Sequence, residues 1–221
     1  MNELILPIDK PVGWTSFDVV AKLRGGLKWK KVGHAGTLDP AATGLLIILC
    51  GDATTRADEF MELGKTYRAV AKLGVVTDSD DLDGEVIAEH DVQWNERLIE
   101  SELRSFVGEI AQRPPAVSAI RIGGKRSYKL ARAGRAVELP ERPVHVHSLD
   151  IVEMNKPFVT FEMRCSKGTY VRSIARDLGE RLGCGGTLAA LRRTAVGPIE
   201  VRDAWTLSAA LAIPEFRGNR S

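Results

Sequence analysis

One aspartate lies in a glycine-containing segment that is suited to chemistry. The segment reads Gly33-His34-Ala35-Gly36-Thr37-Leu38-Asp39-Pro40 and continues as Ala41-Ala42-Thr43-Gly44. It separates a basic stretch from an apolar run, and its glycines let the backbone approach a ligand closely. Asp39 is therefore a candidate catalytic carboxylate. Asp39-Pro40 has a second interpretation, because an Asp cap before a Pro at the first helical position commonly starts a helix. Taken alone, the dipeptide favours the cap.

Other patterns lack residues that their chemistry requires. The segment from Gly123 to Ser127 resembles a phosphate loop, but Ala119 replaces the first glycine and Arg126 stands where a magnesium-binding hydroxyl is needed. The acidic turn from Asp78 to Gly84 resembles a calcium loop, but His90 replaces the bidentate glutamate. Three widely spaced cysteines, Cys50, Cys165 and Cys184, predict free thiols instead of a disulfide framework or zinc site. We therefore expect no metal.

Charge is distributed unevenly although the net charge is only +2. One stretch without acids, between Val19 and Leu38, holds Lys22, Arg24, Lys28, Lys30 and Lys31. A second, from 113 to 137, holds Arg113, Arg121, Lys125, Arg126, Lys129, Arg132 and Arg135. Acids gather between Asp78 and Asp91, so the folded chain could present one basic and one acidic face. Such runs are usually solvated surfaces, but two of this size also suit a polyanionic partner.

Alternating and periodic apolar residues predict the elements that position these groups. Strands are expected at the amino terminus, at 43–50, around 67–73, at 144–154 and at 158–165, the last two as a hairpin. Helices are expected after Thr15 or Ser16, at 54–63, from Asn95 to Phe106, and from Val171 to Leu182. These elements do not alternate strictly. The pattern predicts an α+β fold with a mixed, largely antiparallel central sheet flanked by helices.

One segment stands apart from the sheet. Residues 115–142 are rich in glycine and base and are expected to form an arm inserted between strands. The amino terminus lacks the features of a secretory signal, and the longest apolar run, 45–50, is too short to cross a bilayer. We therefore expect a cytoplasmic protein with no membrane association.

Motifs in a fixed order resemble those of the TruB family of bacterial tRNA pseudouridine-55 synthases. The first two are Lys10-Pro11-Val12-Gly13-Trp14-Thr15-Ser16 and the segment 33–44 that holds Asp39. The others are Lys65-Thr66-Tyr67-Arg68-Ala69, Thr77-Asp78-Ser79-Asp80, Pro114-Pro115-Ala116-Val117-Ser118-Ala119, Gly168-Thr169-Tyr170-Val171-Arg172-Ser173 and Leu191-Arg192-Arg193. Together they extend from about residue 4 to 200.

The resemblance implies a reaction and a substrate. It implies the pseudouridine synthase fold and the isomerisation of a uridine in the T loop of tRNA, at position 55, without cofactor or metal. Asp39 would be the essential carboxylate, either attacking C1′ of the ribose or promoting elimination to a glycal; the sequence does not choose between the two routes. The T stem-loop of tRNA would be the partner of a monomer that needs no other protein.

The resemblance also assigns roles to four residues whose own context favours a plainer interpretation. Arg172 would pair with Asp39 and orient its carboxylate, although by itself it looks like an ordinary exposed helix arginine, as does Arg176. Tyr67 would stack on the uracil and Leu191 would contact its other face, although each could simply be core. His34 would occupy the space vacated when the base flips out of the loop.

Further residues would contact RNA. The arm at about 115–142 resembles the family's thumb, and Arg121, Lys125, Arg126, Lys129 and Arg132 would supply salt-dependent phosphate contacts, with Lys10 in the same RNA-binding set but mainly as support beneath the site. We expect one catalytic domain over 1–221, with the family's carboxy-terminal PUA domain absent or truncated. Two alternatives remain: a guide-RNA-dependent rRNA pseudouridine synthase, and a non-catalytic tRNA-binding or tRNA-folding protein.

Overall fold

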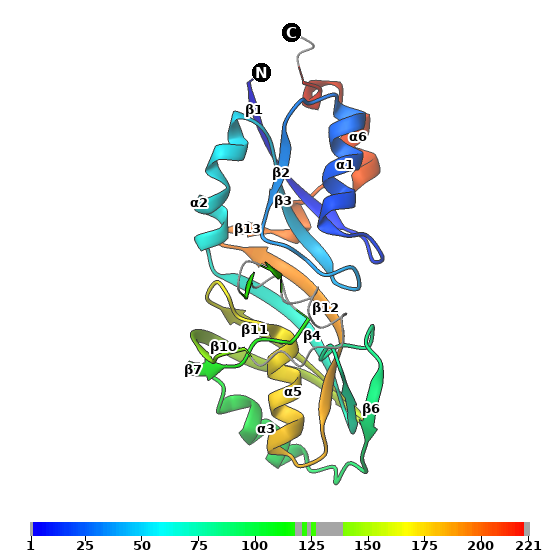
Figure 1. Cartoon of the computed structure of the whole chain (residues 1–221), viewed down its shortest axis with the longest axis vertical. Helices are drawn as coiled ribbons and strands as arrows, with labels where there is room; N and C mark the ends of the chain where they lie inside the picture. Colours follow the sequence, from blue (N-terminus) through cyan, green and yellow to red (C-terminus); the bar gives the residue numbers. More distant parts are fainter. Residues whose placement is uncertain (1, 118–120, 123–124, 127–138, 219–221) are drawn as a thin grey trace. The chain divides into compact units, whose positions relative to one another are not determined.

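In the computed structural model the apolar run becomes the centre of β3 (Thr43–Gly51), which is buried along most of its length. The structure describes residues 2–117, 121–122, 125–126 and 139–218. The chain forms two compact units (Figure 1). The first unit comprises 1–68 and 191–221, and the second comprises 69–190. By their residue ranges, β4 (Lys65–Leu73) and β12 (Gly186–Val196) each belong partly to both.

The strands of the first unit surround β3. β1 (Glu3–Lys10) and β2 (Val32–Ala35) both pair with β3 antiparallel, with Ile5 opposite Leu49 and His34 opposite Ile48. The last part of β12 pairs with β3 in parallel, where Arg193 lies opposite Gly44. β13 (Ile199–Glu200) continues from β12 as an antiparallel partner. The start of β3 thus receives a strand from the far end of the chain.

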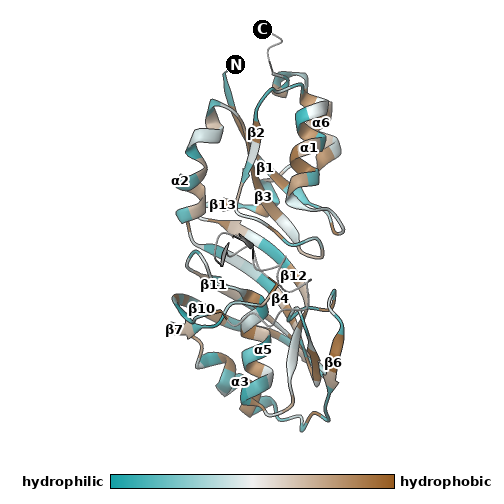
Figure 2. Cartoon of the chain, in the orientation of Figure 1, coloured by the Kyte–Doolittle hydropathy of each residue, from teal (hydrophilic) through white to brown (hydrophobic). Residues whose placement is uncertain are grey.

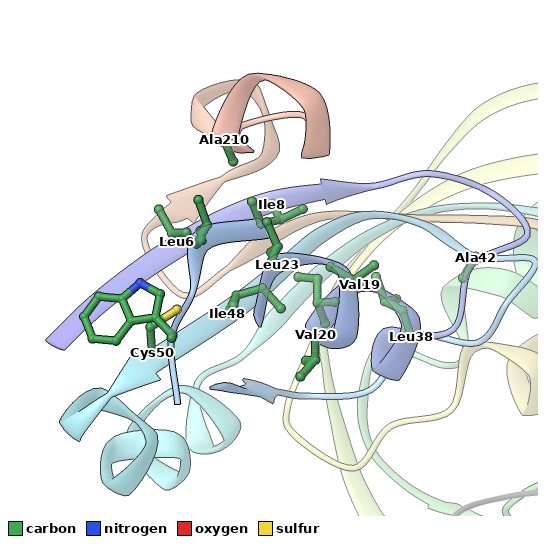
Figure 3. Packing of buried hydrophobic residues seen from close by; sticks show 13 residues of the cluster. Leu6, Ile8, Val19, Val20, Leu23, Leu38, Ala42, Ile48, Cys50 and Ala210 are labelled. Atoms are coloured by element: carbon green, nitrogen blue, oxygen red, sulfur yellow. The ribbon is translucent and has the colours of Figure 1, made fainter. Parts of the chain in front are cut away.

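Helices cover this sheet because each presents an apolar stripe. α1 (Ser16–Leu27) begins with a capping box formed by Thr15 and Asp18 and buries Val19, Val20, Leu23 and Leu27. Figure 3 shows side chains of β1, α1, β3 and the short helix α6 (Leu207–Ala212) pointing toward one another in one core cluster. The other face of β3 packs against a second cluster that Phe60 and Leu63 help to cover. These two lie in or next to α2 (Ala57–Glu62), which follows the 3₁₀ turn η1 (Asp52–Arg56).

The second unit is built on an antiparallel hairpin. β10 (Arg142–Asn155) pairs with β11 (Phe158–Cys165) and, on its other side, with β7 (Gly108–Gln112). β5 (Val75–Thr77) and β6 (Val86–Glu89) form a separate two-stranded sheet. β6 is largely brown in Figure 2 because most of its residues are hydrophobic, and two of these, Val86 and Ile87, are exposed. β8 (Arg121–Ile122) and β9 (Lys125–Arg126) form a further antiparallel sheet of two strands, each two residues long.

Two helices pack together in this unit. α3 (Glu96–Arg104) is capped by Asn95, and α5 (Val171–Arg181) buries Ile174, Ala175 and Leu178. The Arg181 guanidinium lies 4.0 Å from the centre of the Phe106 ring, just after α3. Two further 3₁₀ turns, η2 (Val201–Asp203) and η3 (Pro214–Phe216), belong to the first unit.

The predicted α+β class is confirmed, and so are the strands at 43–50 and 67–73, the hairpin, and the caps Thr15 and Asn95. The three cysteines are free and buried, as predicted. No helix in the described part of the chain is long and apolar enough to cross a membrane.

Candidate active site

Asp39 lies in the loop that joins β2 to β3. The amide of Ala42 donates to the carbonyl of Asp39 at 3.1 Å, which closes a turn, and β3 begins at Thr43. No helix begins at Pro40, so the interpretation of Asp39 as a helix cap is wrong. The side chain is half-buried, which leaves part of the carboxylate accessible. The loop therefore presents this aspartate instead of using it to start an element.

The start of α1 holds the loop on one side. Ser16 Oγ accepts from the amide of Leu38 at 2.9 Å and donates to the carbonyl of the same residue at 3.1 Å. The amide of Gly13 donates to the carbonyl of Pro40 at 2.9 Å. Leu38 itself is buried in the first unit's core. The residues on both sides of Asp39 are thus fixed to the segment that precedes α1 and to its first residue.

Lys10 lies beneath the loop and is completely buried. Its Nζ donates to the carbonyls of Pro11 at 3.0 Å, Trp14 at 2.6 Å and Pro40 at 3.2 Å. Burial lowers the pKa of this ammonium to about 8, and the charge of Asp39 acts in the opposite direction. The expected place of Lys10 among the RNA-contacting bases is corrected here: all three donors of the ammonium are used inside the protein. Its predicted support beneath the loop agrees with these contacts.

Arg193 on β12 holds the other side of the loop. Its guanidinium donates to the carbonyls of Gly36 at 3.0 Å, Thr37 at 3.4 Å and Leu45 at 2.7 Å. The side chain is 1% exposed, and no carboxylate pairs with it within the described residues. A buried guanidinium without an acid is unusual and keeps a positive charge close beneath the loop.

Sequence reasoning missed Arg193, although it lies in the Leu191-Arg192-Arg193 motif. Only Leu191 of this motif was assigned a role. The register shows why the motif matters: Arg192 and Arg193 lie opposite Thr43 and Gly44, directly after the loop. The backbone of Gly44, at φ +99°, comes so close to the backbone of Arg193 that a Cβ would overlap it. Glycine is required there both for its φ and for this contact.

His34 precedes the loop on β2. Its Nδ1 is buried and has no hydrogen-bond partner among the described residues. Burial lowers the pKa of the imidazole, and the charge of Arg193 lowers it further, so His34 is neutral at pH 7. A neutral imidazole with a spare ring nitrogen can fill space beside a base without carrying charge.

The two apolar candidates also belong to the first unit. Leu191 packs against the core cluster that contains Leu38 and Ala42, and its carbonyl accepts from Thr43 Oγ1 at 3.5 Å. It is partly exposed at the end of the loop. Tyr67 is half-buried on β4. Leu191 is thus beside the Asp39 loop, whereas contact of Tyr67 with a uracil remains a prediction.

Arg172 belongs to an ion-pair network of the second unit. It donates to Asp81 at 3.2 Å and to the carbonyls of Ser79 and Val117, each at 3.0 Å. Arg176 pairs with Asp80 at 2.8 Å and with Asp177 at 2.7 Å. Both arginines are buried, so the alternative in which they are ordinary exposed helix residues is wrong. The pairing of Arg172 with Asp39 remains a prediction.

The network changes the interpretation of the acidic turn. Asp80 and Asp81 were expected to contribute to an acidic face, but they meet the two arginines of α5 instead. Burial raises the pKa of Asp80, and Arg176 opposes this effect. The turn is held by Ser79 Oγ, which donates to Asp81 Oδ1 at 2.5 Å. Its acids are therefore partly structural.

The thumb residues are described only in part. Arg121, Lys125 and Arg126 lie in the β8–β9 pair, where Arg121 is opposite Arg126. Lys129 and Arg132 lie outside the described residues. Within the described ranges no group of three or more His, Cys, Asp or Glu side chains is placed to hold a metal ion.

Comparison with known proteins identifies the family. The profile of the TruB family pseudouridylate synthase N-terminal domain matches residues 24–171, and that of the tRNA pseudouridylate synthase B C-terminal domain matches 172–215. The tRNA pseudouridine synthase B of Opitutus terrae is 49% identical over 95% of this chain and 88% of its own length. That of Clostridium kluyveri is 46% identical over 92% and 70%.

Solved structures agree with this assignment. A Cbf5-Nop10-Gar1 complex contains a chain with a TM-score of 0.73 and 30% identity, covering 94% of this chain and 53% of that one. An H/ACA ribonucleoprotein bound to a substrate RNA containing 2′-deoxyuridine gives a TM-score of 0.71 at 27% identity, covering 94% and 52%. From the loop geometry, the two profiles and the relatives, we conclude that this chain belongs to the TruB family of pseudouridylate synthases.

Proposed function

We propose that this chain isomerises a uridine of the tRNA T loop, at position 55, to pseudouridine, with Asp39 as the catalytic carboxylate. The observation that carries the proposal is the Asp39 loop. It presents a half-buried carboxylate that caps no helix, and Lys10 and Arg193 fix the backbone on both sides of it. Relatives named tRNA pseudouridine synthase B, matched over most of the chain, support the substrate class.

The reaction is a balanced isomerisation. The bond between N1 of uracil and C1′ of ribose breaks, the base rotates, and a bond forms between C5 and C1′. The proton on C5 is lost and N1 gains one, so no electrons enter or leave. Neither a redox cofactor nor an energy source is therefore required by the chemistry, and the protein must bind, orient and move protons.

Asp39 serves this chemistry by either of two routes. As a nucleophile it would form a covalent bond to C1′, and as a base it would remove a ribose proton to give a glycal. Both routes need an ionised carboxylate in a fixed position. The buried cations Lys10 and Arg193 supply positive charge and fixed backbone on the protein side of the loop.

The other candidates handle the base. A uridine inside a folded T loop must flip out to be reached. In this proposal neutral His34 fills the vacated space, Tyr67 stacks on the uracil and Leu191 contacts its other face. Arg172 orients Asp39, and Asp81 in turn holds Arg172. Arg121, Lys125, Arg126, Lys129 and Arg132 bind phosphates, and the enzyme acts as a cytoplasmic monomer.

A guide-RNA-dependent activity, the alternative that the motifs left open, is the second candidate, and a chain of the Cbf5-Nop10-Gar1 complex resembles this one at 30% identity. The relatives named tRNA pseudouridine synthase B reach 49% identity, which favours the stand-alone enzyme. Purified protein with unmodified tRNA and no guide RNA separates the two. Modification of the T-loop uridine under these conditions supports the first candidate, and dependence on a guide RNA supports the second.

The catalytic assignment is tested with Asp39→Asn. This substitution keeps the shape of the side chain but removes its charge, so we expect no detectable pseudouridine while tRNA binding persists. Asp58→Asn, which changes an exposed acid of the same unit, is the matched control and should retain wild-type turnover. The product is mapped at nucleotide resolution in tRNA. Robust turnover by Asp39→Asn would refute the role of this carboxylate.

A further inference from the structure

The exposed side of α1 and the turn after it form a strongly basic surface in the first unit, which we call the α1 surface: Phe17, Lys22, Arg24, Gly25, Lys28 and Lys31. We propose that this surface binds the phosphate backbone of the tRNA substrate. The inference rests on the proposed function, since it names a second contact region for the same RNA. It lies apart in sequence from the thumb residues.

The cations of the α1 surface are available to a partner. Lys22, Arg24, Lys28 and Lys31 are exposed, and their side chains have no ion pair or hydrogen bond within the described residues. In the same unit, by contrast, Arg56 pairs with Glu59 at 3.0 Å, Arg192 with Asp9 at 2.7 Å and Arg202 with Glu200 at 3.1 Å. The one acid on α1, Asp18, is used in the capping box. The positive charge of this surface is therefore not neutralised locally.

The geometry of α1 places Arg24 and Lys28 in one stripe, whereas Lys22 lies on the opposite flank of the helix, about 160° around the axis from Arg24. Phe17, Ala21, Arg24 and Lys28 follow one another at helical spacings on the flank beside the buried face. Phe17 is 67% exposed, and an aromatic ring among cations suits a partner that combines phosphates with bases. The stripe is thus complementary to RNA in two ways: its cations match the phosphates, and the Phe17 ring can stack on a base.

Gly25 adds an independent observation. Glycine weakens a helix interior, and at the neighbouring Gly26 a Cβ would force the side chain of Leu211 on α6 to move. A Cβ at Gly25, however, would meet no atom within 4 Å. None of the described residues of the first unit requires glycine at this exposed position, whereas close approach of an RNA backbone would.

Lys28 occupies an unfavourable backbone conformation. It ends α1 at φ 60° and ψ 32°, the left-handed region in which glycine or asparagine is preferred. Attraction of Arg24 and Lys28 to the carboxyl end of the helix dipole is the simpler explanation for their charge. That explanation does not extend to Lys31, which lies beyond the helix next to β2. Phosphate binding accounts for the positive charge at Arg24, Lys28 and Lys31 alike.

The α1 surface starts at the active-site loop. Ser16, the first residue of α1, exchanges two hydrogen bonds with Leu38, the residue before Asp39. From there α1 extends for about 18 Å, as expected for its 12 residues. Arg24 and Lys28 lie about 12 and 18 Å along the axis from Ser16, a span that an RNA larger than the flipped nucleotide can bridge.

The test compares two double variants that lose the same charge. Arg24→Gln with Lys28→Asn removes two cations of the α1 surface, and Asn tolerates the left-handed conformation at 28. Arg56→Gln with Arg202→Gln removes two arginines that already pair with acids. Binding of unmodified tRNA is measured between 50 and 200 mM KCl, together with KM and kcat for pseudouridine formation.

We expect the α1-surface variant to bind about tenfold more weakly at low salt and to raise KM. Its slope of log affinity against log salt should fall by about 1.5, since each lost phosphate contact removes roughly 0.7 to 0.9. The control variant, Arg56→Gln with Arg202→Gln, should change little in tRNA affinity or in the salt slope. Equal slopes and affinities in the two variants, or a loss confined to kcat, would overturn the proposal. Absence of pseudouridine formation by the wild type would instead refute the proposed function.

Discussion

Asp39 lies within a loop whose backbone is fixed by side chains from distant parts of the chain. Ser16, Lys10 and Arg193 together occupy the carbonyls of Gly36, Thr37, Leu38 and Pro40. Two of these three side chains are cations that lack the usual buried carboxylate partner among the described residues. Buried charge of this kind is costly, so its presence beneath the only loop predicted to be catalytic has a functional meaning.

Lys10 gives a prediction about pH. The protonated ammonium donates to three carbonyls, one of them that of Pro40, and the neutral amine retains only two donors. Because its pKa is about 8, we expect kcat to fall as the pH rises through 8. The measurement is kcat at saturating tRNA from pH 6.5 to 9.5.

Stability separates this effect from unfolding. The pKa of Lys10 is about 8 in the folded chain against 10.5 ordinarily, so between these values the unfolded chain binds more protons. The contribution of Lys10 to the free energy of unfolding therefore rises with pH across this window. As the pH rises, kcat is therefore expected to fall while the contribution of Lys10 to the free energy of unfolding increases. A kcat that stays flat to pH 9.5 would contradict the role given to the Lys10 ammonium.

Site residues differed in how far the sequence could predict them. Asp39 was predicted as the catalytic carboxylate from its loop and from the family motif, and the structure removed the competing helix cap. Lys10 was assigned partly to RNA contact and proved buried. Arg193 and Asp81 received no individual role, because their partners are Gly36, Thr37 and Arg172, more than 90 positions away. Local pattern does not reveal such partners.

At the scale of elements, short-range signals predicted well and long-range pairing did not. The capping residues Thr15 and Asn95 and the period of α5 depend on neighbours within a few positions, and they were predicted correctly. β12 was not predicted as a strand, although it pairs with β3 in parallel. Its sequence contains two arginines where a buried strand would ordinarily be apolar, because Arg193 serves the loop.

Two glycines allow a paired prediction about stability. Gly25→Ala should raise the free energy of unfolding by about 0.5–1 kcal/mol, since the Cβ meets no atom and alanine favours the helix. Gly44→Ala should lower it by about 2–3 kcal/mol, because φ is +99° and the Cβ overlaps the Arg193 backbone. Urea unfolding followed by circular dichroism measures both. Equal stability of the two variants would show that the backbones of Gly44 and Arg193 can move apart at little cost in free energy, against this prediction.

For the whole molecule, the distribution of charge matters more than the net value of +2. Part of the acidic segment is used internally, since Asp80 and Asp81 pair with Arg176 and Arg172. The cations of the acid-free stretch on and after α1 stay exposed, and apart from Lys30, which has a partner, they form no ion pair within the described residues. The sequence predicted both basic stretches, but it did not predict where the acids would be neutralised.

The thumb gives the corresponding prediction on RNA affinity. Reversing charge with Arg126→Glu and Lys129→Glu should weaken tRNA binding more at low salt than at high salt, because exposed phosphate contacts are screened by ions. Filter binding at 50 and 300 mM KCl measures the difference. Glu59→Lys, a change on the surface of α2, serves as a folding control. Equal losses at both salt concentrations would remove the thumb from the electrostatic contacts.

The Arg193 contacts finally set an order of events in the making of the enzyme. They join residues 148 to 157 positions apart, so the loop has its aspartate early but its support only when β12 has been synthesised. A nascent chain that has grown as far as Ala190 carries every residue from Lys10 to Arg172 and still lacks Arg192 and Arg193, the residues of β12 that pair with Thr43 and Gly44. The carboxylate thus takes its final place only after Arg193 has left the ribosome, so in this proposal catalytic competence follows the synthesis of β12.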